Sequence, residues 1–199
     1  MLPLIYTMPP YTIVFVSVVV ITRAPETILL FWRRSQHDPT MRQEDRGSLV
    51  VMSLVTGGGV IVACLLPIVW TGAAIPWLRQ EVTIAGIVVF LLGAALRWWA
   101  ILSLGRYFTM DVQLRSTQSV VQSGPYRFVR HPSYTGILIM LLGVGLVLAS
   151  WASIVVILVG GVIGLGYRVA VEERALVDAL GQPYVDYMRQ TQRFIPFIV

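Results

Sequence analysis

The sequence predicts an all-α, polytopic helical membrane protein with about five transmembrane helices and a cytoplasmic ligand-binding cap. Composition is the first observation. Of 199 residues, 56% are hydrophobic and 13% are charged, and the mean hydropathy is +0.76. A soluble domain carries about 25% charged residues. The second observation is a series of apolar stretches near the ~20 residues that a spanning helix needs. The length suits one domain and is short for a large transporter.

The first apolar segment lies within Leu2 to Trp32, and its clean core is Tyr11 to Ile21. Two interpretations remain open for it. The span begins near Pro3, or it runs on past Pro25 with a kink, because proline removes a helix hydrogen bond. The N-terminus lacks the basic region and cleavage site of a signal peptide, so we expect this segment to be retained.

Four further spans follow. The second is Ser48 to Trp70, which is uncharged and contains Gly57, Gly58 and Gly59; adjacent glycines in a membrane favour close helix approach. The third is Val82 to Leu104. The fourth and fifth are Tyr134 to Leu148 and Trp151 to Tyr167, separated only by Ala149 and Ser150. That short connection predicts a tight antiparallel hairpin.

Arginine distribution predicts the orientation. All fifteen basic residues are arginine. They gather in the loop 33–47, the segment 105–130 and the tail from Arg168, whereas the loops 71–81 and 149–150 carry only Arg79. The positive-inside rule then puts the N-terminus outside and the C-terminus in the cytoplasm, next to anionic lipids. No arginine-rich run interleaves with aromatic residues, so the sequence gives no reason to expect nucleic-acid binding.

Two polar cytoplasmic segments flank the hairpin and would form the cap. The loop 105–132 holds a strand-like stretch, Thr109 to Leu114, and a turn signal at Ser123-Gly124-Pro125. The tail from Val171 to Arg189 is typical of an amphipathic helix broken near Gly181-Gln182-Pro183. The single cysteine, Cys64, has neither a disulfide partner nor companions for a metal site, so no metal is expected.

Two clusters of ionisable and polar side chains stand out. They are Arg130, His131 and Tyr134 at the start of the fourth span, and Arg168, Glu172 and Glu173 at the end of the fifth. A hairpin brings these two helix ends to the same membrane face. Arg168 and Glu172 share one helical face, whereas Glu172 and Glu173 lie about 100° apart on a helix and should have different partners.

The pattern of motifs resembles the isoprenylcysteine carboxyl methyltransferase family between Leu96 and Pro196. The residues that carry the resemblance are Leu96 to Ala100, Leu104 to Thr109, Ser123 to Arg127, Arg130 to Gly136, Val171 to Glu173, and Tyr184, Tyr187, Thr191, Arg193 and Pro196. The Arg-His-Pro-x-Tyr-x-Gly motif, followed by a hairpin and Glu-Glu, is specific as a combination. Residues 1–95 would then be structural helices shaping a substrate entrance, and residues 96–199 the methyltransferase core.

The resemblance implies an S-adenosylmethionine-dependent enzyme with a cytoplasmic site and a lipophilic substrate that enters from the bilayer. It implies a cofactor-binding set of Gln118, Val120, Val121, Gly124, Tyr126, Arg130, His131, Tyr134, Glu172, Glu173, Arg193 and Pro196. Catalytic roles are predicted for Arg97, Tyr134, Arg168 and Glu172. O-methylation of a carboxylate is the expected reaction, since a carboxylate nucleophile needs no general base.

Arg97 has two interpretations. An arginine inside a span is a functional-site candidate that could hold an acidic substrate. Alternatively, its side chain snorkels to the nearby cytoplasmic interface.

Other functions remain open from the sequence. A phospholipid N-methyltransferase or a thiol methyltransferase would use the same cofactor. A sterol-type membrane reductase would use NADPH, but such chains are about twice as long. A non-enzymatic scaffold or transport subunit is the third class. A polar path across the bilayer would need ionisable residues in the second, fourth and fifth spans, and those spans are nearly free of charge.

Overall fold

The computed structural model describes residues 2–35, 42–43, 47–105, 108, 113–114 and 120–194. Its α-helices are α1 (Leu4–Thr7), α2 (Pro9–Ser35), α3 (Ser48–Val69), α4 (Arg79–Leu104), α5 (Pro132–Val147), α6 (Trp151–Leu180) and α7 (Gln182–Gln190). Short 3-10 helices are η1 (Thr71–Ala73) and η3 (Gly124–Arg127). The strands β1 (Arg42–Gln43) and β2 (Gln113–Leu114) pair antiparallel, and β2 falls inside the predicted strand-like stretch.

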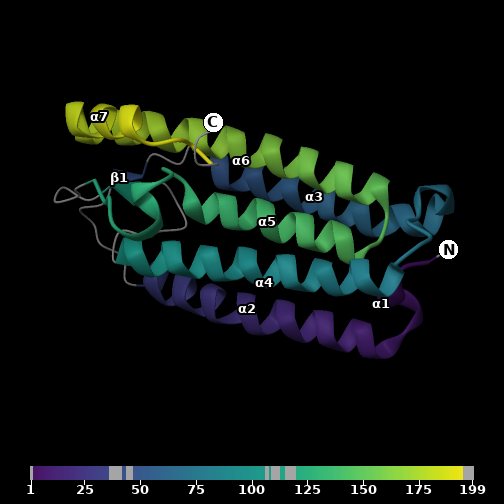
Figure 1. Cartoon of the computed structure of the whole chain (residues 1–199). Helices are drawn as coiled ribbons and strands as arrows, with labels where there is room; N and C mark the ends of the chain where they lie inside the picture. Colours follow the sequence, from purple (N-terminus) through teal and green to yellow (C-terminus); the bar gives the residue numbers. More distant parts are fainter. Residues whose placement is uncertain are drawn as a thin grey trace.

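The long helices run side by side as one elongated bundle (Figure 1). α4 packs mainly against α5, and α3 packs mainly against α6. The N-terminus and α7 lie at opposite ends of the bundle (Figure 1). Within the described residues, four helices are long and apolar enough to cross a membrane: α2 over Pro9–Leu29, α3, α4 and α6. α5 is a shorter apolar helix. The predicted polytopic helical fold is therefore confirmed.

The outer surface of the bundle is apolar, as expected of a protein that faces lipid. On α3, for example, Leu54, Ile61 and Val69 are 63–77% exposed. A soluble monomer rarely exposes such a continuous apolar surface. The bundle therefore has apolar side chains on its surface where a soluble protein would have charged ones.

Glycines bring α4 and α5 together. A Cβ placed on Gly93 would lie 2.7 Å from the carbonyl oxygen of Gly136, and one placed on Gly136 would lie 2.8 Å from that of Gly93. Between α3 and α6, Gly59 faces Gly160 at 3.7 Å, while nothing lies within 4 Å of Gly57 or Gly58. Of the three adjacent glycines, Gly59 is thus the one that faces another helix.

Two of the predicted helices are longer than expected. α2 continues through Pro25 to Ser35, which agrees with the second interpretation of the first span. α6 has 30 residues, so the fifth span and the first part of the predicted tail helix form one continuous helix. The hairpin prediction is confirmed: α5 passes into α6 through Ala149, at φ 46°, and Ser150. Gly181, at φ 62°, then breaks the chain before α7.

Candidate active site

The predicted polar clusters meet where α4 ends, α5 begins and α6 runs out toward α7. Gly124 shapes the backbone just before α5. Its φ of 59° lies in the left-handed region, and a Cβ there would collide with the side chain of Ser103 on α4. Only glycine satisfies both conditions. The chain then passes through η3 into α5. Pro132 is the first residue of α5, and His131 is its N-cap.

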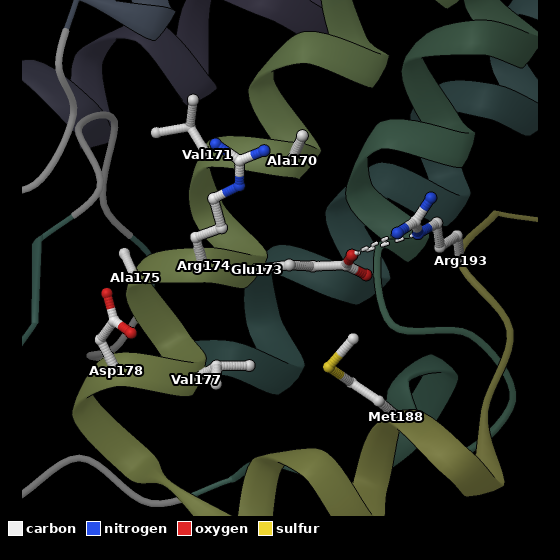
Figure 2. A pocket seen from close by; sticks show the side chains of 9 residues that line it. All are labelled: Ala170, Val171, Glu173, Arg174, Ala175, Val177, Asp178, Met188 and Arg193. Carbon is white, nitrogen blue, oxygen red and sulfur yellow. Dashed lines mark hydrogen bonds and ion pairs between the residues drawn. The ribbon is translucent and has the colours of Figure 1, made fainter.

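Glu173 is the centre of a buried ion-pair cluster. Its Oε1 accepts hydrogen bonds from Arg130 Nε at 3.0 Å and lies 3.3 Å from His131 Nε2. Its Oε2 pairs with Arg193 Nη2 at 3.0 Å (Figure 2). The Glu173 and Arg130 side chains are less than 10% exposed, whereas Arg193 is about half exposed. Removing one member of such a cluster leaves the others buried without compensation.

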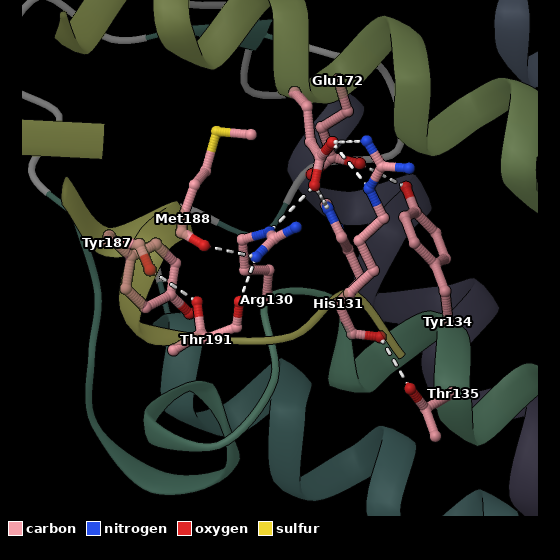
Figure 3. A network of polar contacts seen from close by, with 10 residues as sticks. Arg130, His131, Tyr134, Thr135, Glu172, Tyr187, Met188 and Thr191 are labelled. Atoms are coloured by element: carbon pink, nitrogen blue, oxygen red, sulfur yellow. Dashed lines mark hydrogen bonds and ion pairs between the residues drawn. The ribbon is translucent and has the colours of Figure 1, made fainter. Parts of the chain in front are cut away.

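The residues 191–194, which we call the C-terminal strap, lie along the start of α5. The backbone N–H groups of Arg130 and His131 donate to the carbonyls of Gln192 at 2.7 Å and Arg193 at 3.1 Å. Thr135 Oγ1 donates to the Phe194 carbonyl at 2.7 Å. The Arg130 guanidinium also donates to the carbonyls of Met188, at 2.9 Å, and Thr191 (Figure 3). Arg130 therefore joins three elements.

Glu172 has different partners from Glu173, as expected from their angular separation. The Tyr134 hydroxyl donates to Glu172 Oε2 at 2.7 Å (Figure 3). The same hydroxyl oxygen accepts from Arg168 Nε at 3.3 Å. Arg168 Nη1 in turn donates to Ser48 Oγ at 2.7 Å. The first turn of α5 is thus joined to α6 and to the start of α3.

Arg97 lies between α4 and α5 and is only 8% exposed. Its Nη1 donates to Ser133 Oγ at 2.7 Å and lies 3.3 Å from the Ser133 carbonyl oxygen. Its guanidinium carbon is 5.9 Å from the ring centroid of Phe108. The side chain is therefore directed at the first turn of α5 and is enclosed by protein.

Three tyrosines, Tyr126, Tyr184 and Tyr187, lie close together, and Tyr187 contacts the strap through Thr191. The Tyr187 hydroxyl donates to the Tyr126 carbonyl at 2.6 Å. Burial raises the pKa of Tyr187 to about 12. Burial, together with the nearby Glu172 charge, also raises the pKa of Tyr126 and of Tyr184 above the ordinary tyrosine value. Like ordinary tyrosines, all three are neutral at physiological pH, and the Tyr187 hydroxyl acts as a donor to the Tyr126 carbonyl.

A cavity of about 480 Å³ opens beside Glu173 between α6, α7 and the strap. Its lining combines apolar, acidic and basic side chains (Figure 2). They are Ala170, Val171, Glu173, Arg174, Ala175, Val177, Asp178, Met188 and Arg193. Among the residues that the structure describes, no three His, Cys, Asp or Glu side chains are grouped as metal ligands.

Most of the residues predicted from the sequence lie at this end of the bundle. The structure joins Arg130, His131, Glu173 and Arg193 in one cluster and Tyr134, Arg168 and Glu172 in another. Arg97 contacts the same turn of α5. Val120 and Val121 are half-buried residues just before Gly124. Gln118 and Pro196 lie outside the described residues.

Three polar residues of the site were not predicted. Ser133 contacts Arg97, Thr135 contacts the strap, and Ser48 contacts Arg168. Ser133 and Thr135 belong to the Arg-His-Pro motif, so the motif could have indicated them. Ser48 is 120 residues away from Arg168 in sequence and belongs to no motif. Its only local signal is its place at the start of an apolar helix.

Comparisons with known proteins point to one family. The profile of the isoprenylcysteine carboxyl methyltransferase (ICMT) family matches residues 85–178. Protein-S-isoprenylcysteine O-methyltransferase B of Arabidopsis thaliana is 28% identical, over 85% of this chain and 90% of its own length. The Protein-S-isoprenylcysteine O-methyltransferase of Tribolium castaneum is 34% identical, over 57% of this chain and 41% of its own length.

A solved structure is also similar. The eukaryotic intramembrane Ras methyltransferase ICMT (isoprenylcysteine carboxyl methyltransferase), solved without a monobody, aligns with a TM-score of 0.60 and 30% identity. The alignment covers 73% of this chain and 52% of that one. The chain thus spans nearly all of the Arabidopsis relative, but only about half of the length of the Tribolium protein and of the solved structure.

Proposed function

We propose that the protein is an integral membrane methyltransferase that uses S-adenosylmethionine, because residues 85–178 match the profile of the isoprenylcysteine carboxyl methyltransferase family and the chain is similar to proteins of that name. The acceptor is the carboxylate of a lipophilic molecule, such as a prenylcysteine. Residues 96–199 form the methyltransferase core, and residues 1–95 shape the lipid-facing substrate entrance. The site lies at the cytoplasmic face, with the N-terminus outside.

One observation carries the proposal: the ionisable motif residues converge at one end of an otherwise apolar bundle. Two adjacent carboxylates on α6, Glu172 and Glu173, meet the start of α5 there. Transport would instead need polar groups spread across the bilayer. Convergence at one interface suits chemistry on a molecule anchored in the membrane.

The residues present fit the cofactor. S-adenosylmethionine has two cationic groups, a carboxylate, a ribose diol and an adenine ring, so its site needs acidic, basic and apolar surfaces. The cavity beside Glu173 and Arg193 offers all three. Its volume of about 480 Å³ lies in the range of small-molecule sites. The proposed cofactor-binding set is the one predicted from the sequence.

When bound, the cofactor supplies an electrophilic methyl group on a sulfonium that is already a good leaving group. The protein residues therefore mainly bind and orient. Arg97, fixed by Ser133 and enclosed by protein, holds the acceptor carboxylate as a planar donor. Glu172 and the Tyr134 hydroxyl define the polar wall of the reacting region. No residue has to remove a proton, because a carboxylate is already ionised near neutral pH.

The first experiment is calorimetry on detergent-purified protein with S-adenosylhomocysteine and, in parallel, NADPH. The variants are Glu172→Ala and His131→Ala, with Asp186→Asn as the matched control because Asp186 is about half exposed on α7. We expect the wild type and Asp186→Asn to bind S-adenosylhomocysteine with micromolar affinity. We expect both site variants to lose most of that binding while remaining folded by circular dichroism.

A second measurement identifies the acceptor class. Transfer of labelled methyl groups is compared between a farnesylated cysteine derivative with a free carboxylate, the same molecule as its amide, and phosphatidylethanolamine vesicles. Transfer to the free carboxylate alone supports the proposal. Transfer to the phospholipid indicates an N-methyltransferase instead. In the calorimetry, binding of NADPH without binding of S-adenosylhomocysteine would contradict the proposal that the protein is a methyltransferase.

A further inference from the structure

A buried hydrogen bond connects the N-terminal half of the protein to the site. Ser48 is the first residue of α3 and is fully buried. Its hydroxyl accepts a hydrogen bond of 2.7 Å from Arg168 Nη1 on α6. Ser48 lies outside residues 85–178, the part that matches the family profile. Neither the Ser48 hydroxyl nor this bond has a role in the proposed reaction as described above.

Arg168 contacts both Ser48 and the site. The side chain is buried, with 2% of the residue exposed, and its Nε donates to the Tyr134 hydroxyl oxygen at 3.3 Å. A guanidinium is rigid and planar, so fixing one nitrogen fixes the direction of the others. Arginine only donates, so the Tyr134 hydroxyl must direct its own proton elsewhere. It donates to Glu172 Oε2 at 2.7 Å.

We propose that Ser48 is a positioning residue: its hydroxyl fixes the Arg168 guanidinium, which sets the orientation of the Tyr134 hydroxyl and of the Glu172 carboxylate. This inference rests on the proposed function for its effect on turnover. The hydrogen-bonded series Ser48, Arg168, Tyr134 and Glu172 crosses from α3 through α6 to α5. The start of α3 thereby takes part in ordering the methyl-transfer region.

The packing of α3 on α6 has other supports, so the role of Ser48 is separable from helix association. Gly59 faces Gly160, and Gly164 lies against Thr56 and Met52. At the far end of the same helix pair, Ser153 on α6 donates to the Ala63 carbonyl on α3 at 2.8 Å. Ser153 is also fully buried. It supplies a matched control: the same residue type, burial and helix pair, remote from the site.

The test compares Ser48→Ala, Ser48→Thr and Ser153→Ala by ¹⁹F NMR of protein labelled with 3-fluorotyrosine. The Tyr134 signal is assigned by its loss in Tyr134→Phe. We expect Ser48→Ala to shift or broaden that signal, because Arg168 loses an acceptor and reorients. Ser48→Thr, which keeps the hydroxyl, restores the wild-type position, and Ser153→Ala leaves it unchanged. This readout needs neither cofactor nor turnover.

Kinetics provide the second readout. We expect Ser48→Ala to lower kcat by about tenfold, as a small misplacement in a site does, with little change in the affinity for S-adenosylhomocysteine. Ser48→Thr recovers the rate, and Ser153→Ala retains it. A Tyr134 signal that stays in place in Ser48→Ala, or a kcat that falls equally in both alanine variants, overturns the inference. If the wild type itself neither binds the cofactor product nor transfers methyl groups, the proposed function fails, while the NMR result still decides whether Ser48 orients Tyr134.

Discussion

Glu172 and Glu173 are adjacent in sequence and have separate partners. Glu172 accepts from a neutral hydroxyl, whereas Glu173 is surrounded by two arginines and a histidine. Because Glu173 pairs with both Arg130 and Arg193, it helps to bind the C-terminal strap to the start of α5. Glu172 instead shares a hydroxyl group with Arg168, since the Tyr134 hydroxyl donates to Glu172 and accepts from Arg168.

The first prediction at the residue scale concerns Glu173→Gln. The change keeps the shape but removes the charge that Arg130, His131 and Arg193 share. We expect a loss of about 3 kcal/mol in the free energy of unfolding, as for a broken buried ion pair. Thermal unfolding in detergent measures it. The control Asp186→Asn breaks the exposed pair with Arg189 and should change stability little; equal effects of the two variants would contradict the prediction.

The second prediction concerns Arg97→Lys. Lysine keeps the positive charge but lacks the planar donors that reach Ser133. We expect the KM for a carboxylate acceptor to rise about tenfold, because hydrogen bonds to a charged group are worth about 1.5–3 kcal/mol. The exposed Arg127, which lies over the Phe128 ring at 5.2 Å, supplies the control Arg127→Lys. An unchanged KM in Arg97→Lys would exclude a role for Arg97 in acceptor binding.

Much of the site was predictable at this scale, because its residues are local motif members. His131, Tyr134, Glu172 and Glu173 were found from polar side chains at two apolar helix ends that a hairpin must bring together. The strap contacts and the Ser48 bond were not, since both depend on tertiary pairing between distant segments. No local periodicity or spacing encodes such a pairing.

At the scale of the elements, two helix pairs hold the bundle together, and glycine determines how closely they approach. The starts of the helices were predicted within a few residues, since apolar runs define them. The break near Gly181 was also predicted, but the continuity of α6 was not: the predicted fifth span ends at Tyr167, before Arg168, Glu172 and Glu173, and the tail was predicted as a separate helix. The helix nevertheless continues to Leu180, because those charges find partners on neighbouring elements instead of ending the helix.

The prediction at this scale is that Gly143→Ala destabilises the bundle. A Cβ on Gly143 would lie 2.6 Å from the backbone nitrogen of Phe90 and 2.7 Å from the Gly86 carbonyl oxygen. Overpacking of this kind costs about 1–3 kcal/mol, which thermal unfolding would record as a lower Tm. Gly57→Ala is the matched control, because nothing lies within 4 Å of that position. A Tm unchanged in Gly143→Ala would show that α4 and α5 separate without penalty.

At the scale of the whole molecule, the orientation proposed from the arginine distribution has a direct test. Cys64→Ser gives a background free of cysteine. Single cysteines are then introduced at Trp77, which is 64% exposed between α3 and α4, and at Arg189 on α7. With a membrane-impermeant maleimide, we expect intact cells to label the Trp77→Cys variant only. Permeabilised cells should label both, and the opposite pattern would reverse the orientation.

The shortness of α5 has a consequence for how the proposed enzyme meets its acceptor. With 16 residues, α5 is about 24 Å long, less than the ~30 Å of the hydrocarbon layer. Its first turn lies deeper in the bundle than the end of α4, because Ser133 pairs with Arg97 and α4 continues from there to Leu104. A lipid-anchored acceptor reaches that depth by lateral diffusion alone. The quantity that saturates such an enzyme is the mole fraction of acceptor among the lipids, so adding inert lipid at constant bulk concentration should slow turnover.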